Sequence, residues 1–193
     1  KKVIIATGTE RRTLGIPKEY ELVGKGISYC ATCDAPFYRE KVAGVVGGGN
    51  AALASALVLS IHAKKVYIFY RQKEFFRPEA VRIEEIKEKE NIEPIFNVNP
   101  VKLIGDEKLE AVELDDGSTV DLDGLFVEIG STPNSELAER LGVKITDNGY
   151  IVTDEERRTN IPGIYAAGDV IDSPLKQAIT AAGQGAEAGE AVF

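Results

Sequence analysis

The stretch KVAGVVGGGNAA (residues 41–52) decides the fold. KVAGVV is a short run of mostly β-branched and small apolar residues, typical of a buried strand, and glycines follow it at once. AALASALVLSIHA (51–63) predicts a helix, and KKVYIFYR (64–71) predicts the next strand. Strand, glycine turn, helix and strand form a βαβ unit of about thirty residues, the minimum for a parallel crossover. The stretch therefore predicts an α/β fold with a Rossmann-like domain.

The glycine turn fits the pattern G-x-G-x-x-A, with Gly47, Gly49 and Ala52 at the small positions. The first glycine allows a tight turn, the second lets the backbone approach a pyrophosphate, and the third small residue lets the helix pack on the strand. The helix N-terminus adds N–H groups and partial positive charge. The alternative is a glycine-rich turn that binds no ligand. We expect a dinucleotide to contact Gly47, Gly48, Gly49, Asn50, Ala51 and Ala52.

The end of the second strand carries cations where an NAD site usually has an acid for the ribose 2′-OH. Tyr70 is followed by Arg71 and Gln72, and Arg77 comes shortly after. Guanidinium groups suit a 2′-phosphate. The alternative is that both arginines are solvated surface residues. We expect Arg71, Gln72 and Arg77 to bind the cofactor, which is NADPH in preference to NADH, although NADH is not excluded.

The only two cysteines are Cys30 and Cys33, and Asp34 follows them. A structural zinc site needs about four ligands, and this chain has one histidine besides the pair. A structural disulfide across two residues would remove little chain entropy. A C-x-x-C motif beside a nucleotide-binding βαβ unit favours a redox pair. Asp34 would then serve as a general acid, or alternatively as a helix-capping carboxylate.

Composition and charge exclude several classes of protein. The chain has 193 residues and a net charge of 23 − 31 = −8, which argues against a nucleic-acid binder or a membrane-surface binder. No apolar run reaches the length of a membrane span, and no stretch resembles a signal peptide. We therefore expect a cytoplasmic protein.

Four motifs together resemble those of the low-molecular-weight thioredoxin reductases of bacteria and archaea. In chain order they are CATCD (30–34), VVGGGNAA (45–52), IPGIYAAGDV (161–170) and QAITAAGQG (177–185). The resemblance covers nearly the whole chain, and the combination of the first motif with AAGDV is highly specific. It implies a flavoprotein disulfide reductase.

The resemblance also implies the domain organisation. In this family a domain that binds NADPH is inserted into a domain that binds FAD. Residues 24–129 would be the NAD(P)H-binding domain with the cysteine pair, and residues 1–23 and 130–193 would be parts of the FAD-binding domain. Ile129 and Gly130, at the junction, would contact the cofactor.

For FAD, the resemblance points to two segments near the C-terminal end of the sequence. Gly168 and Asp169 match the motif that holds the ribityl and phosphate region, and Gln177, Ala178 and Ile179 match the segment beside the isoalloxazine ring. Read without the family, Asp169 is equally suited to an N-cap.

The implied activity is thioredoxin-disulfide reduction, in which electrons pass from NADPH through FAD to the Cys30–Cys33 disulfide and then to thioredoxin or a similar small dithiol protein. By resemblance, Cys33 faces the flavin, Cys30 attacks the protein substrate, and Asp34 transfers protons. Family members are typically homodimers. A peroxiredoxin is an alternative substrate, because related reductases of peroxiredoxins carry the same pair.

Three departures from the family pattern bear on these expectations. An N-terminal G-x-G-x-x-G segment for the FAD pyrophosphate does not occur in this sequence, so we expect only part of the FAD-binding domain. Tyr70-Arg71-Gln72 replaces the usual H-R-R at the 2′-phosphate loop. Ala54 and Ser55 stand where acidic residues often follow the glycine loop. A second hypothesis is therefore a nucleotide-binding module with an inactive cysteine pair.

Overall fold

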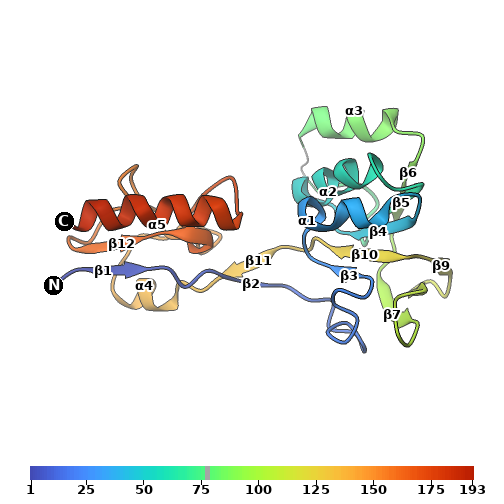
Figure 1. The fold of residues 1–193 in the computed structure, drawn as a ribbon, viewed down its shortest axis with the longest axis horizontal. Coiled ribbons are helices and arrows are strands. Elements are labelled where there is room, and N and C mark those ends of the chain that lie inside the picture. The colour runs from blue at the N-terminus through green and yellow to red at the C-terminus, as the bar shows by residue number, and fades with distance from the viewer. Residues whose placement is uncertain (77–78) are drawn as a thin grey trace. The chain divides into compact units, whose positions relative to one another are not determined.

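The computed structural model describes residues 1–76 and 79–193, and it divides into two compact units (Figure 1). The central unit is the continuous segment Thr13–Gly130. The terminal unit combines Lys1–Arg12 with Ser131–Phe193. Residues 13–23 belong to the central unit by their contacts, and their Leu22 is buried in its core. The cofactor that each unit binds stays a prediction.

A five-stranded parallel sheet forms the middle of the central unit, with the order β3-β10-β4-β5-β6. Its strands are β3 (Ile27–Ser28), β10 (Gly124–Val127), β4 (Val42–Val46), β5 (Lys65–Tyr70) and β6 (Ile92–Phe96). Helix α2 (Asn50–Ser60) connects β4 to β5, which confirms the predicted βαβ crossover. The α/β fold class is therefore confirmed.

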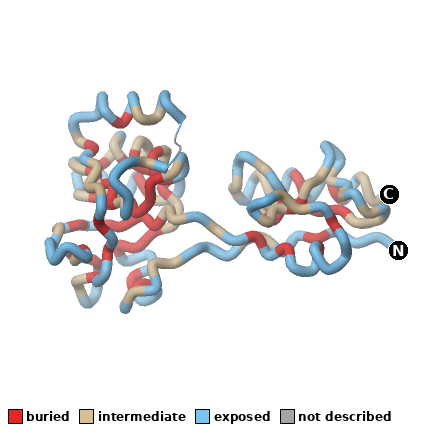
Figure 2. The backbone as a smooth tube through the Cα atoms, turned by 180° about the vertical axis from the view of Figure 1, so that it is seen from behind, coloured by how far each residue is buried: buried red, intermediate tan, exposed pale blue. Residues whose placement is uncertain are grey.

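Alternate residues of the strands face two different layers. Ala43 and Val45 of β4 belong to a buried cluster with Leu53 and Leu59 of α2. The next residue, Val46, belongs to a second cluster on the opposite face of the sheet. This alternation is what a strand with two buried faces requires. Figure 2 shows the resulting concentration of buried residues along these strands.

The second layer is a three-stranded antiparallel sheet made of β7 (Pro100–Ile104), β8 (Ala111–Leu114) and β9 (Thr119–Asp121). Leu103 and Val112 of this layer pack with Phe69 and Leu125 of the parallel sheet. The predicted β-meander with a turn at Asp115-Asp116-Gly117 is confirmed, and its final strand, β10, joins the parallel sheet.

Three further helical segments complete the central unit. A short α1 (Ala31–Asp34) runs into a 3₁₀ turn (Ala35–Tyr38), directly after β3. Helix α3 (Ala80–Glu88) precedes β6, and it is amphipathic as predicted, with Ile86 buried and Val81 exposed.

The terminal unit is built from segments that are far apart in sequence. β1 (Val3–Ile5) pairs in parallel with β12 (Ile164–Ala166), and β2 (Thr9–Arg11) pairs antiparallel with β11 (Ser131–Pro133). The helical elements are α4 (Glu136–Arg140), a 3₁₀ turn (Gly168–Val170) and α5 (Ala178–Val192). The expectation of a fully buried first strand is wrong in this structure, because only Ile5 of β1 is buried. No helix in the described part of the chain is long and apolar enough to cross a membrane.

Candidate functional site

The glycine loop lies at the C-terminal end of β4, where the backbone is tightly enclosed on one side. Gly47 has a φ of +142°, and a Cβ atom added there would collide with the carbonyl oxygen of Glu128. A Cβ atom at Gly48 would collide with the ring of Tyr70. A Cβ atom at Gly49 would meet no atom within 4 Å. The loop therefore needs two glycines for packing, and at Gly49 it leaves space for a ligand to approach the backbone.

The first turn of α2 is suited to phosphate binding. Its N-cap is Gly49, and no side chain caps the N–H groups of this end. Ala52 is fully buried, and its Cβ lies 3.0 Å from the position of a Cβ at Gly47, so a larger residue would push the helix away from the strand. Uncapped N–H groups at the start of an eleven-residue helix attract an anion. These features fit the pyrophosphate of a dinucleotide.

Asn50 and Ala51 lie in this first turn with exposed side chains. The Asn50 side chain is engaged with Glu79, because it donates from Nδ2 to Oε1 at 3.2 Å and accepts the Glu79 N–H at 2.8 Å. This pair ties the start of α2 to the N-cap of α3. A nucleotide would therefore contact Asn50 through its backbone.

The segment after β5 is attached to the glycine loop. Phe76 donates its N–H to the carbonyl oxygen of Gly48 at 2.8 Å, and Gln72 accepts the N–H of Asn97 at 3.2 Å. Arg71 and Gln72 are exposed at this end of the sheet. The structure thus places Arg71 on a segment bonded to the loop, as a 2′-phosphate contact requires. Arg77 lies outside the described residues.

The end of β10 lies beside the glycine loop on its other side. Glu128 donates its N–H to the carbonyl oxygen of Val46, and its carboxylate accepts a 2.6 Å hydrogen bond from Ser55 of α2. Ile129 is half-buried against the second core cluster, and Gly130 has a φ of +96°. Sequence reasoning did not identify Glu128 as a site residue, because the bond that positions it joins residues 73 apart in sequence.

Cys30 and Cys33 form a disulfide, with Cα atoms 5.3 Å apart. Cys30 is the N-cap of α1, and its Sγ accepts the N–H of Cys33 at 3.2 Å. This donor favours a negative charge on the Cys30 sulfur after reduction. Within the described residues, no three His, Cys, Asp or Glu side chains are grouped closely enough to hold a metal ion.

Asp34 is held by a residue that the sequence reasoning missed. Ser28 is only 4% exposed, and its Oγ donates to Oδ2 of Asp34 at 2.6 Å while accepting the N–H of Cys30 at 3.1 Å. Asp34 closes α1, and its side chain makes no capping bond to the 3₁₀ turn that it precedes, so the helix-capping alternative is wrong. The available signal was a serine at the end of a strand, two residues before the cysteine.

Tyr38 adds a proton-binding group near Asp34. Burial, and then the negative charges of Asp34 and Asp123, raise the pKa of Tyr38 above its usual value of 10.0. Its ring lies edge-on to Phe126, with 5.1 Å between centroids, and fills the space that a side chain at Gly124 would need. The phenol therefore stays protonated next to the disulfide-bearing turn at neutral pH.

In the terminal unit, Gly168 and Asp169 form a turn that is anchored from behind. Gly168 has a φ of +80° and donates its N–H to Oε1 of Gln184 at 2.9 Å. Lys176 donates to the carbonyl oxygen of Asp169 at 2.8 Å. Ala167, and not Asp169, is the N-cap of this turn, so the N-cap alternative is wrong. Gln184 was missed because its partner is distant in sequence.

Gln177, Ala178 and Ile179 lie at the start of α5. Gln177 is the N-cap without a side-chain capping bond, and Ile179 in the first turn is 81% exposed. An uncapped helix end with an exposed apolar side chain, next to a glycine turn, fits one part of a flavin dinucleotide.

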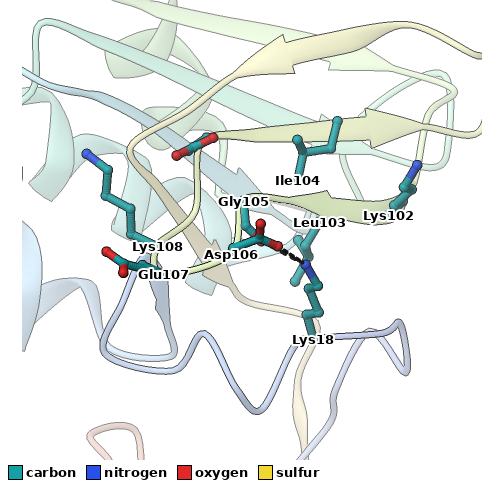
Figure 3. A pocket seen from close by; sticks show the side chains of 9 residues that line it. Lys18, Lys102, Leu103, Ile104, Gly105, Asp106, Glu107 and Lys108 are labelled. Atoms are coloured by element: carbon teal, nitrogen blue, oxygen red, sulfur yellow. Dashed lines mark hydrogen bonds and ion pairs between the residues drawn. The ribbon is translucent and has the colours of Figure 1, made fainter.

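A separate open pocket of about 740 Å³ lies between the segment around Lys18 and the β7–β8 hairpin (Figure 3). Lys18 donates to Oδ1 of Asp106 at 2.8 Å across it. Cations and carboxylates are mixed in its lining, which includes Lys102, Lys108 and Glu107. None of the predicted site residues lines this pocket.

The fold and these motifs define a class of nucleotide-binding disulfide enzymes. Residues 1–185 match the model of the pyridine nucleotide-disulphide oxidoreductase family. The chain belongs to this family.

Particular relatives narrow the similarity further. The chain is 44% identical to a thioredoxin reductase of Mycoplasma genitalium, over 97% of this chain and 61% of that protein. It is 35% identical to an alkyl hydroperoxide reductase of Staphylococcus epidermidis, over 100% of this chain and 39% of the relative. The crystal structure of thioredoxin reductase from Streptococcus pyogenes superimposes with a TM-score of 0.89 at 35% identity, over 100% of this chain and 64% of that one. The chain thus spans less than two thirds of the length of these relatives.

Proposed function

We propose that the chain acts in a thioredoxin-disulfide reductase, with NADPH at the glycine loop, FAD at the terminal unit and Cys30–Cys33 as the redox-active disulfide. The observation that carries the proposal is the disulfide itself, which lies in the same compact unit as an open, uncapped dinucleotide loop. The similarity to thioredoxin reductases over almost the whole chain supports it.

When bound, NADPH and FAD supply the two electrons that reduce the disulfide. The chain's own residues determine the thiol chemistry after that reduction. Reduction of the disulfide consumes two electrons and two protons and leaves two thiols. The N–H of Cys33 stabilises the Cys30 thiolate, which makes Cys30 the attacking nucleophile.

Exchange with the substrate then proceeds in two balanced steps. The Cys30 thiolate attacks one sulfur of the substrate disulfide, so that a mixed disulfide forms and a substrate thiolate leaves. Cys33 then attacks the Cys30 sulfur, which restores the intramolecular disulfide and releases the second substrate thiolate. Asp34, held by Ser28, supplies and accepts the protons of these steps.

The finer features of the proposal rest on the sequence motifs and the family. Arg71 favours NADPH over NADH, because its segment is bonded to the glycine loop. Thioredoxin is the proposed partner, in a cytoplasmic homodimer.

A second candidate substrate is the disulfide of a peroxiredoxin. It is favoured by the similarity to the alkyl hydroperoxide reductase, which extends over the whole chain. Side-by-side rates with oxidised thioredoxin and an oxidised peroxiredoxin would separate the two, and faster reduction of the peroxiredoxin would favour this second candidate.

The first test is a visible absorption spectrum of the purified protein, recorded alone, after NADPH, and after oxidised thioredoxin. We expect a flavin band that bleaches with NADPH and returns with thioredoxin. The Cys33→Ser variant should bind NADPH normally and accumulate a mixed disulfide between Cys30 and thioredoxin, whereas Cys30→Ser should not. A protein that binds NADPH but has no flavin and reduces no thioredoxin would support the alternative, a nucleotide-binding module with an inactive pair.

A further inference from the structure

The carboxylate of Glu128 is the feature of the nucleotide site that the proposed function leaves unexplained. It follows β10, next to a loop built to bind anionic phosphates. A negative charge at that place weakens phosphate binding unless it serves another part of the ligand.

The topology of the sheet indicates which part of the dinucleotide lies near Glu128. A dinucleotide crosses the C-terminal ends of the strands, with its pyrophosphate at the glycine loop after β4 and its adenosine half over the next strand, β5. β10 is the neighbour of β4 on the side opposite to β5. The nicotinamide half therefore lies over the end of β10, where Glu128 begins the following segment.

Two contacts fix Glu128 at this position. Its carbonyl oxygen lies so close to Gly47 that a side chain there would collide with it. Its Oε1 accepts a 2.6 Å bond from Ser55, which is 8% exposed on the inner face of α2. A carboxylate has about four lone-pair positions, so one bond from a hydroxyl does not exhaust its capacity. The serine sets the direction of the side chain.

We propose that Glu128, oriented by Ser55, accepts a hydrogen bond from the carboxamide N–H₂ group of the nicotinamide and so positions the ring. This inference rests on the proposed NADPH site and adds a specificity-determining residue to it. The same two positions account for a departure from the family pattern: a serine on α2 holds a carboxylate that β10 supplies.

The test compares two probes that share the adenosine half. NADPH carries the nicotinamide, and 2′,5′-ADP carries the 2′-phosphate without it. Binding of NADPH is followed by the fluorescence of its dihydronicotinamide ring, and binding of 2′,5′-ADP by calorimetry. We expect Glu128→Gln to weaken NADPH about tenfold, the usual effect of losing one charge-assisted hydrogen bond, and to leave 2′,5′-ADP unchanged or slightly tighter.

Variants of Ser55 separate positioning from simple stability. Ser55→Ala should weaken NADPH about threefold to tenfold, and Ser55→Thr should restore binding because it keeps the hydroxyl. Ser60→Ala is a matched control, since Ser60 lies on the same helix and donates to the carbonyl oxygen of Leu57. Glu93→Gln is a second control, because Glu93 on β6 pairs with Lys65. Thermal unfolding by circular dichroism verifies that each variant is folded.

Each outcome decides between the alternatives. Equal losses for NADPH and 2′,5′-ADP in Glu128→Gln, or no loss for either, would overturn the proposed contact while the NADPH site stands. If the unsubstituted protein binds neither probe, the proposed nucleotide site is itself wrong, and the inference falls with it.

Discussion

At the scale of single residues, the chemistry of the cysteine pair depends on a buried serine. Ser28 both receives the N–H of Cys30 and donates to Asp34, so one hydroxyl links the cysteine backbone to the proton-transfer group. Removal of the hydroxyl leaves the Asp34 carboxylate without this donor and free to turn away from the sulfurs. A carboxylate that is misplaced by about 1 Å loses much of its catalytic value.

We expect Ser28→Ala to slow disulfide exchange with thioredoxin by about tenfold and to lower the free energy of unfolding by about 1–3 kcal/mol. Ser28→Thr should restore the rate if its methyl group fits. Ser118→Ala is a matched control, because Ser118 donates to Asp116 at 2.6 Å on an exposed turn. Stopped-flow measurement of exchange gives the rates, and an unchanged rate in Ser28→Ala would contradict the role.

Tyr38 gives a prediction about alkaline pH. Burial, with the charges of Asp34 and Asp123, raises the pKa of its phenol above 10.0 in the folded state. The folded protein therefore keeps this proton at pH values where the unfolded chain loses it. The stability that results is fully present below pH 10.0 and is lost as the pH rises through the folded-state pKa.

We therefore expect Tyr38→Phe to reduce the decline of the free energy of unfolding above about pH 10 and to change it by less than about 1 kcal/mol near pH 7. Urea denaturation over this range measures the effect. Tyr20→Phe serves as the control, since the Tyr20 side chain is 76% exposed. The same alkaline decline in Tyr38→Phe as in the unsubstituted protein would show that other groups dominate.

At the scale of elements, the glycine loop separates two demands that the sequence pattern combines. Gly47→Ala places a Cβ against the carbonyl oxygen of Glu128 at a φ of +142°, so we expect a loss of about 2–4 kcal/mol in stability. Gly49→Ala meets no atom within 4 Å and has a φ of −98°, so its stability should change by less than about 1 kcal/mol. Its new methyl group stands where the phosphates approach and should weaken NADPH binding.

Chemical denaturation and NADPH fluorescence of both alanine variants measure these effects separately. If Gly49→Ala bound NADPH as tightly as the unsubstituted protein, the phosphates would not approach the backbone at this position. Equal destabilisation by both substitutions would show that the tight contact with Glu128 is not the reason for the glycine at position 47.

The sequence was sufficient for elements that are defined by local pattern. β4, α2 and β5 follow from alternation, small residues and glycine, all of which are read within about thirty residues. The bonds from Ser55 to Glu128 and from Gly168 to Gln184 were not predictable, because each joins residues that only the tertiary fold brings together. For β1, the apolar residues of VII indicated burial, but apolar composition does not say which face is covered.

At the scale of the whole molecule, the two units differ in how the chain builds them. The terminal unit requires both ends of the chain, because β1 pairs with β12 in the register Val3 with Ile164. The central unit is continuous, and both of its buried clusters, its sheet and its disulfide lie within residues 13–130. A continuous segment with its own core is the usual form of an independently folding domain.

We expect the excised segment 13–130 to fold cooperatively, to retain the disulfide and to bind NADPH with the affinity of the full chain. Its first residues are part of the core: Leu22 is 1% exposed, and the buried carboxylate of Glu19 accepts the N–H groups of Leu14 and Gly15 and the hydroxyl of Tyr29. A matched fragment that begins at residue 24 lacks Leu22 and this carboxylate. It should therefore be less stable by at least about 2–4 kcal/mol.

Thermal unfolding by circular dichroism, together with NADPH titration of the two fragments and the full chain, tests this domain boundary. A segment 13–130 that is unfolded in isolation would show that the central unit depends on the terminal unit for its stability. Equal stability of the two fragments would place the boundary at residue 24, as the family resemblance divides the chain, because residues 13–23 would then contribute nothing to the core of the nucleotide-binding unit. The lower stability expected for the shorter fragment follows from the burial of Leu22 and Glu19, and a boundary at residue 13 assigns both side chains to the unit that buries them.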